Sequence, residues 1–205
     1  MKSKILVGIA ALSLATPLLA APGNSFIDGY YVPSAGVEAE NAGLLGLDEE
    51  GDGAGVKGAI EFAPQLFLTG EYQSNQYDDN GSDLELDTYR IGLGLGEGLG
   101  NGQGIYGRVE FINADDGSDD AEEDSGIVGT LGLGAILSPQ VKIYGEAGYQ
   151  KFDDLDGPEL LAGIALRLLP NLGVFADYRY TQLDLQDTDV EFTYDEFRIG
   201  ARFYF

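Results

Sequence analysis

Apolar and polar residues alternate along most of this sequence. In the stretch LFLTGEYQ (66–73), Leu68 and Tyr72 share one parity, and Thr69 and Glu71 share the other. A period of two predicts half-buried β-strands, and no such segment shows the spacing of an amphipathic helix. The ten predicted strands are Phe26–Pro33, Val56–Phe62, Leu66–Gln73, Tyr89–Gly96, Ile105–Phe111, Ile127–Leu137, Val141–Tyr149, Leu160–Leu168, Leu172–Tyr180 and Phe197–Phe205.

The connections between these strands alternate in length. The short ones are 63–65, 97–103, 138–140 and 169–171, and the long acidic ones are 39–53, 78–83, 113–125, 152–159 and 182–190. An even number of strands, with short turns at one end and long loops at the other, is typical of outer-membrane barrels. We therefore predict an all-β protein, a transmembrane antiparallel up-and-down β-barrel of ten strands, with eight strands as the alternative.

The first twenty residues predict a cleaved signal peptide. Lys2 and Lys4 precede an apolar stretch (5–16), Pro17 ends it, and a small-residue cleavage site follows at Ala20. The alternative is an uncleaved membrane anchor, but the apolar stretch is shorter than the roughly 20 residues that a spanning helix needs. We expect residues 1–20 to be removed and residues 21–205 to form the barrel, without a transmembrane helix.

The basic residues have the most specific placement. Of the nine Lys and Arg that remain after cleavage, all but Lys151 have the parity that a barrel turns inward. A basic side chain that faces lipid at the bilayer midplane would cost about 2–4 kcal/mol, which explains this placement in a barrel. Five acids share the inward parity. The predicted lumen-lining residues are Lys57, Glu61, Glu71, Arg90, Arg108, Glu110, Lys142, Glu146, Arg167, Asp177, Arg179, Arg198 and Arg202.

Symmetric hairpins would place some of these charges opposite one another. A hairpin centred on Pro64 sets Lys57 against Glu71, and one centred on Gly100 sets Arg90 against Glu110. A bulge or an asymmetric turn would shift either register. Small inward residues (Gly92, Gly94, Gly132 and Gly163) are expected to leave some free volume between the charges.

Composition excludes several function classes. The chain has no His and no Cys, which removes the usual zinc, haem and iron–sulfur ligands and the common catalytic triads. Its 35 acidic and 11 basic residues give a net charge of −24. A chain this acidic is not expected to bind nucleic acid, which requires a basic surface. The glycine run 92–104 matches no phosphate-binding motif and precedes no helix.

Acidic clusters in the predicted long loops are weak candidates for metal binding. Asp115, Asp116, Asp119 and Asp120 form the densest cluster. Carboxylates of this kind could bind Ca²⁺ or Mg²⁺ weakly and bridge them to lipopolysaccharide phosphates, although no cluster has the EF-hand spacing. The alternative, which we favour, is a solvated loop whose charges repel one another. We expect no other cofactor.

The final residues, FRIGARFYF (197–205), alternate and end on Phe205, with Phe203 two positions before it. This segment resembles the β-signal that the assembly machinery of Gram-negative bacteria reads in outer-membrane barrels. With the signal peptide and FIDGYY (26–31), the whole predicted barrel resembles the small OmpX/OmpA-like family. The resemblance implies an outer-membrane location, a monomer, and contacts with membrane lipid, lipopolysaccharide and the barrel assembly machinery. Omptin proteases share only the strand count, and their chemistry needs a His.

Three functions are consistent with these observations. The first, which we favour, is a structural or surface-interaction barrel with a charge-filled lumen and acidic extracellular loops. The second is a narrow, porin-like channel for small solutes, because ten strands leave slightly more room than the eight that side chains just fill. The third is an enzyme that uses inward carboxylates and arginines. No positioned base or nucleophile supports it, so we expect no enzymatic activity.

Overall fold

The computed structural model describes residues 25–40, 48–79, 82–115, 124–186, 188 and 190–205. The predicted signal peptide lies outside these ranges. The strands are β1 (Phe26–Glu40), β2 (Asp48–Ala63), β3 (Leu66–Asp79), β4 (Ser82–Gly100), β5 (Gln103–Asp115), β6 (Asp124–Ser138), β7 (Val141–Lys151), β8 (Leu155–Leu169), β9 (Leu172–Leu185) and β10 (Glu191–Tyr204). No helix within the described ranges is long and apolar enough to cross a membrane.

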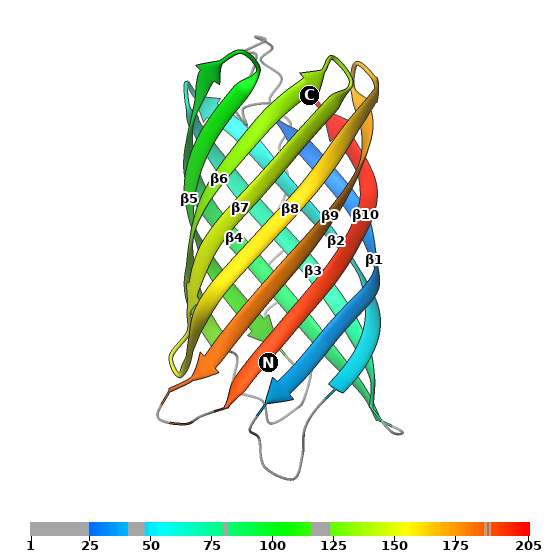
Figure 1. The fold of residues 1–205 in the computed structure, drawn as a ribbon, viewed down its shortest axis with the longest axis vertical. Coiled ribbons are helices and arrows are strands. Elements are labelled where there is room, and N and C mark those ends of the chain that lie inside the picture. Colours follow the sequence, from blue (N-terminus) through cyan, green and yellow to red (C-terminus); the bar gives the residue numbers. More distant parts are fainter. Residues whose placement is uncertain (1–24, 41–47, 80–81, 116–123, 187, 189) are drawn as a thin grey trace, which may run out of the picture.

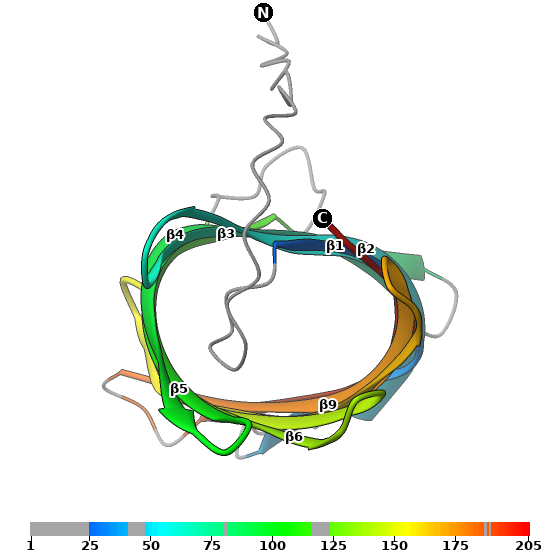
Figure 2. The same ribbon diagram turned by 90° about the horizontal axis from the view of Figure 1, so that it is seen from above.

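The strands form one closed ring. Each strand pairs antiparallel with the next along the chain, and β1 pairs with β10 to close the barrel (Figure 1). Seen from above, the sheet encloses a single lumen (Figure 2). This arrangement confirms the predicted all-β, up-and-down barrel and its ten strands.

Two-residue turns join the strands at the end of the barrel where β10 finishes, at the top of Figure 1. In the first turn, Pro64 is followed by Gln65 with a φ of 71°, and in the second, Asn101 and Gly102 have φ values of 51° and 77°. Proline followed by a residue of positive φ is typical of a tight type II turn. In outer-membrane barrels, short turns face the periplasm and longer loops face outward. We therefore name the two ends the periplasmic end and the extracellular end.

At the extracellular end the strands are longer than the sequence indicated. β3 continues to Asp79, β8 begins at Leu155 and β9 continues to Leu185, so much of the expected loops 78–83, 152–159 and 182–190 is strand. Strand pairing needs only backbone partners, so it continues beyond the point where the outward side chains stop being apolar. At the other end, β4 extends to Gly100 and narrows the expected turn 97–103 to two residues.

The outer surface is apolar between two aromatic borders. Leu131, for example, is 69% exposed on β6. Phe62 and Phe203 are exposed towards the periplasmic end, and exposed tyrosines lie towards the extracellular end. Tyr31 donates its hydroxyl hydrogen bond to Asp52 at 2.9 Å. A ring with an apolar body and a solvated hydroxyl suits the boundary between membrane and water.

Inside the barrel, aromatic rings occupy the space beside glycines of the neighbouring strand. Phe67 stands opposite Gly94, where an added Cβ would lie 2.1 Å from the ring. Tyr106 covers Gly132 in the same way, with its ring 2.2 Å from the position of a Cβ. The further pair is Tyr144 over Gly163. The expectation that these glycines leave free volume is therefore wrong: a strand glycine permits close approach, and the rings use that space. At Gly92, the backbone and side chain of β5 occupy the equivalent space.

The seam between β1 and β10 closes the barrel around a local irregularity. The register shifts between Tyr31 and Ser34, and the residue between Val32 and Ser34 is Pro33. Proline has no N–H to donate, so a bulge is where a closed sheet can accommodate it. On the periplasmic side of the bulge, Asp28 stands directly opposite Arg202.

Candidate functional site: the barrel lumen

Two carboxylates gather cations from several strands inside the barrel. Glu71 accepts hydrogen bonds from Arg179 Nη2 at 2.8 Å and Arg198 Nη1 at 2.8 Å. Asp177 accepts from Arg198 Nε at 2.6 Å and from Lys57 Nζ at 2.8 Å. Arg198 thus links both carboxylates and is completely buried. Charge-assisted hydrogen bonds of this kind offset the cost of removing the ions from water.

Tyrosine hydroxyls complete the shells of the same carboxylates. Tyr30 donates to Glu71 Oε1 at 2.6 Å, and Tyr144 donates to Asp177 Oδ2 at 2.9 Å. Lys57 Nζ also lies 4.5 Å from the centre of the Phe175 ring. The group is therefore held by packing as well as by charge.

A second set of contacts crosses the lumen. Arg90 on β4 binds both oxygens of Glu159 on β8, with nitrogen–oxygen distances of 3.0 and 2.7 Å. Gln150 donates to the same carboxylate at 2.7 Å. Arg179 lies 3.7 Å from Glu159 and 3.8 Å from Glu196, so it connects this set with the one around Glu71.

Two smaller ion groups lie nearer the periplasmic end. Arg108 binds both oxygens of Glu146 at 2.9 and 2.7 Å and also reaches Glu110 at 2.8 Å. Arg202 binds both oxygens of Asp28 at 2.7 Å across the β1–β10 seam. Each is a planar fork on a carboxylate, a geometry that favours Arg over Lys.

The predicted lumen-lining residues separate into two groups. Ten of the thirteen form ion pairs within the barrel. The other three, Glu61, Lys142 and Arg167, form no ion pair with any residue that the structure describes. Lys142 and Arg167 line the cavity discussed below, and Glu61 is half-buried on β2.

One of the two predicted registers is confirmed and the other is wrong. Lys57 stands opposite Glu71, as expected, although its ion pair reaches across to Asp177. Arg90 stands opposite Ile112, and Glu110 stands opposite Gly92. The cause is the turn at residues 101–102, which is centred further along the chain than Gly100 and shifts every pair in that hairpin.

Sequence reasoning missed three acids of the network. Asp28 pairs with Arg202, Glu159 pairs with Arg90, and Glu196 accepts hydrogen bonds from Gln73 and Asn75. Asp28 and Glu159 lie between outward apolar or glycine residues, so the parity that identified the basic residues would also have identified these two acids. Glu196 follows Asp195, and that second acid interrupts the alternation. Glu159 was assigned to a loop.

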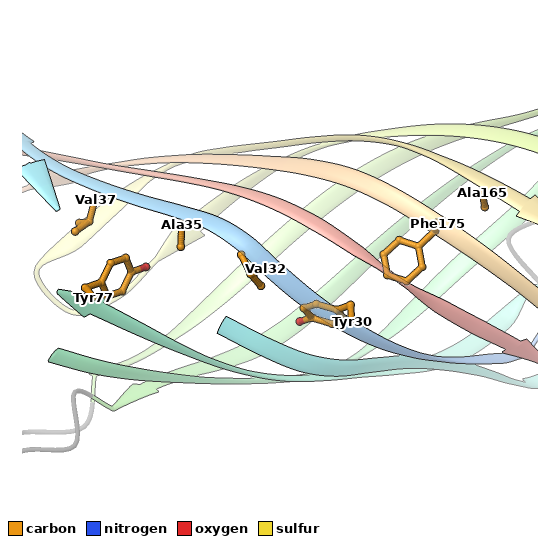
Figure 3. Close-up of a cluster of buried hydrophobic side chains, with 7 residues drawn as sticks. All are labelled: Tyr30, Val32, Ala35, Val37, Tyr77, Ala165 and Phe175. Carbon is orange, nitrogen blue, oxygen red and sulfur yellow. The ribbon is translucent and has the colours of Figure 1, made fainter. Parts of the chain in front are cut away.

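Buried apolar side chains cluster inside the barrel towards the extracellular end. Ile112, Val128, Phe152 and Leu183 form a buried cluster drawn from β5, β6, β9 and the β7–β8 connection, and Val128 is fully inaccessible. A second cluster runs along the inside of β1. Figure 3 shows it as a row from Val37 and Tyr77 at one end to Ala165 at the other; its members are Tyr30, Val32, Ala35, Val37, Tyr77, Ala165 and Phe175.

The periplasmic part of the lumen is open. A cavity of about 390 Å³ is lined by the turn residues Gly102 and Pro139, by Tyr204 near the end of β10, and by Glu71 and Arg198 of the ion network. We call this cavity the vestibule. It lies between the periplasmic turns and the ion network.

The remaining predicted residues lie near the two ends. Asp115 ends β5, whereas Asp116, Asp119 and Asp120 lie outside the described residues. Among the residues described, no group of three or more acids is arranged to hold a metal ion. Phe203 and Phe205 are exposed on the outer surface, with ring centres 6.4 Å apart.

A family model described as "Outer membrane protein beta-barrel domain" matches residues 8–167. A search of curated protein sequences finds no match to the chain.

Several solved barrels are similar at low sequence identity. Neisserial surface protein A is 15% identical, with 91% of this chain and 99% of that chain covered and a TM-score of 0.46. Ail, the attachment invasion locus protein of Yersinia pestis, is 15% identical, with 88% and 99% covered and a TM-score of 0.39. The translocator domain of the autotransporter NalP from Neisseria meningitidis is 14% identical, with 89% and 88% covered and a TM-score of 0.49.

Likenesses at these scores carry no argument about function. The family match is a separate finding, because it extends over most of the chain and its description agrees with the closed antiparallel barrel. This protein belongs to the outer membrane protein β-barrel family and resides in the outer membrane.

Proposed function

We propose that this protein is a non-conducting barrel that displays acidic extracellular segments at the cell surface, in a structural or surface-interaction role. The observation that supports this proposal is a set of side-chain contacts inside the barrel. The Arg90–Glu159 pair joins β4 to β8, which are four steps apart in a ring where five steps is the maximum separation. Nearer the extracellular end, Ile112, Val128, Phe152 and Leu183 form a buried apolar cluster.

The same contacts would make the barrel a rigid support. Ion pairs and rings from strands on opposite sides brace the sheet from within, and bracing of this kind holds the extracellular ends of the strands in fixed positions. Those ends carry exposed acids such as Glu50, Asp52 and Glu85. Function in such proteins is concentrated on the loops that the scaffold positions. We expect a monomer inserted by the barrel assembly machinery.

The surface role includes contact with lipopolysaccharide. Divalent cations, Ca²⁺ or Mg²⁺, would bridge the acidic segments, including Asp115, Asp116, Asp119 and Asp120, to lipopolysaccharide phosphates. Calorimetric titration of the folded protein with millimolar Ca²⁺ tests this part of the proposal. Absence of any binding heat would remove it and leave the display role to be tested separately.

Single-channel recording in planar bilayers tests the closed lumen. Wild-type protein should insert without conductance steps, whereas a porin added to the same bilayer should show them. A variant with Arg90, Phe152 and Glu159 all changed to Ala should conduct if it folds, because it removes the cross-lumen pair and part of the apolar cluster. Stable steps from the wild-type protein would contradict the proposal.

The alternative is a narrow channel for small solutes. The vestibule favours it, because a cavity of about 390 Å³ already opens the periplasmic part of the path. Its basic lining would then make any conductance anion-selective, and Lys142→Gln would reduce that selectivity. We expect no enzymatic activity: the chain has no His or Cys, and most lumen carboxylates are bound to Arg.

A further inference from the structure

The vestibule has an excess of positive charge. Its lining includes seven basic residues, Lys57, Arg108, Lys142, Arg167, Arg179, Arg198 and Arg202, and three acidic ones, Glu71, Glu110 and Glu146. Asp28 and Asp177 pair with lining cations from just outside it. Glu159 and Glu196 also contact Arg179 from outside the lining, so we count as excess only the lining cations that have no carboxylate partner, and there are two.

The two excess charges can be assigned to Lys142 and Arg167. The other five basic residues each contact a carboxylate within 2.8 Å. The side chains of Lys142 and Arg167 form no ion pair and no hydrogen bond with any residue in the described part of the chain. An isolated cation in a partly enclosed site is costly, so an anion that enters the vestibule would gain the unused interaction.

The strand register places these two residues near one another on the inner face of the sheet. Lys142 on β7 stands opposite Ala165 on β8, and Arg167 is the next inward residue along β8. Diagonal neighbours on one face of a sheet are about 7–8 Å apart, within reach of long side chains. The Arg167 guanidinium lies 4.2 Å from the centre of the Tyr204 ring, which fixes its plane and leaves its N–H groups available at the edge.

A second, separate observation lies at the inner wall of the vestibule. Arg198 uses Nε and Nη1 on carboxylates, but its buried Nη2 has no hydrogen-bond partner. Buried donors are normally satisfied, and an unsatisfied one needs an explanation. The lining of the vestibule also includes apolar and aromatic side chains, among them Phe26, Tyr106 and Ile136.

We propose that the vestibule binds a small organic anion from the periplasmic side, with its phosphate or carboxylate group between Lys142 and Arg167 and its apolar part against the aromatic lining. The oxyanion accepts from the Lys142 ammonium and from the Arg167 guanidinium edge. The surplus positive charge at the mouth attracts the anion. This site is independent of whether the lumen conducts.

Calorimetric titration of the full chain in non-ionic detergent tests the proposal, with phenyl phosphate as the probe. Phenyl phosphate should bind, inorganic phosphate should bind more weakly, and phenol should not bind measurably. Lys142→Gln and Arg167→Gln should each weaken phenyl phosphate binding about tenfold or more, since each removes a charge-assisted hydrogen bond. Lys151→Gln, which removes an exposed lysine beyond the vestibule, should leave the affinity unchanged.

A measurement on unaltered protein covers the case in which a variant fails to fold. Phenyl phosphate should protect Lys142 from reductive methylation, detected by mass spectrometry, while Lys151 in the same sample is modified at an unchanged rate. Absence of binding at millimolar phenyl phosphate would overturn the proposal. Equal affinity in folded Lys142→Gln and Arg167→Gln variants, or unprotected Lys142, would do so too.

Discussion

Arg90 and Glu159 form a two-pronged ion pair across the lumen, and each side chain is at most 5% exposed. The strands that carry these residues, β4 and β8, are not paired with each other and lie on different sides of the ring. The pair therefore connects two parts of the sheet that backbone hydrogen bonds leave separate.

Removal of one partner should be far more damaging than replacement of both. Arg90→Met leaves Glu159 buried with one hydrogen bond from Gln150 and a longer contact of 3.7 Å to Arg179, and should cost about 3–5 kcal/mol of unfolding free energy. Arg90→Met combined with Glu159→Leu should recover most of that loss, because apolar side chains of similar volume avoid the burial of charge. Urea unfolding in lipid vesicles measures both. Equal losses in the single and double variants would show that the pair matters through its shape rather than its charge.

The ring over Gly94 predicts a steric effect. Gly94→Ala places a methyl group against Phe67 and should destabilise the barrel by about 1–3 kcal/mol, the usual range for an overpacked core. Adding Phe67→Leu should restore part of this stability. Gly129→Ala is the matched control, since nothing lies within 4 Å of its added Cβ. If both alanine variants unfold at the same urea concentration, the effect of Gly94→Ala on stability comes from the backbone and not from contact with the Phe67 ring.

Acidification should stabilise one corner of the extracellular end. Burial, and then the nearby carboxylates of Asp153 and Asp154, raises the pKa of Asp124 at the start of β6. A carboxyl with a raised pKa in the folded state binds its proton more tightly there than in the unfolded chain, so stability increases as the pH falls through that folded pKa. Amide-exchange protection of residues 125–128 should therefore rise as the pH is lowered from neutral towards the ordinary aspartate pKa of about 4.

Asp124→Asn should raise that protection at neutral pH and remove its pH dependence. Glu50→Gln, an exposed change on β2, should leave residues 125–128 unaffected. An undiminished pH response in Asp124→Asn would assign the effect to another group.

The terminal aromatic residue is predicted to act in assembly. Phe205→Ala should reduce severalfold the amount of folded protein in the outer membrane, as measured by its resistance to extraction and its heat-modified gel mobility. Phe62→Ala is the control, because Phe62 is 59% exposed and Phe205 57% exposed. Equal reduction by both changes would indicate a shared role at the membrane boundary in place of a signal.

The strands and the direction of their side chains could be read from the sequence because alternation is a local property. Lys57 and Glu71 were matched correctly because their hairpin turns at Pro64, whose fixed φ marks the centre. The next hairpin turns within a glycine-rich run, and several centres are equally consistent with that composition. Arg90 and Glu110 were consequently paired wrongly by two positions.

The interior could be predicted only in part because it depends on contacts between distant strands. Parity shows that Arg90 and Glu71 face inward, but it contains no information about which strand lies across the lumen. Barrel closure and stagger, which set those contacts, are properties of the whole ring. The same limit explains the wrong expectation of free volume at Gly94. The sequence shows an inward glycine there but not that the Phe67 ring occupies the space beside it.

Asp28 and Arg202 are separated by 174 residues in sequence and are buried together at the seam. Until β10 is in place, the Asp28 carboxylate lacks both hydrogen bonds from Arg202, and burying it without them would cost several kcal/mol. β1 therefore cannot settle into its final environment ahead of the rest, and contacts this distant are slow to form. A chain that stops before its tenth strand does not become a slightly smaller barrel: it retains an acid without its Arg202 partner and two open sheet edges, so the last strand determines whether the first nine are stable.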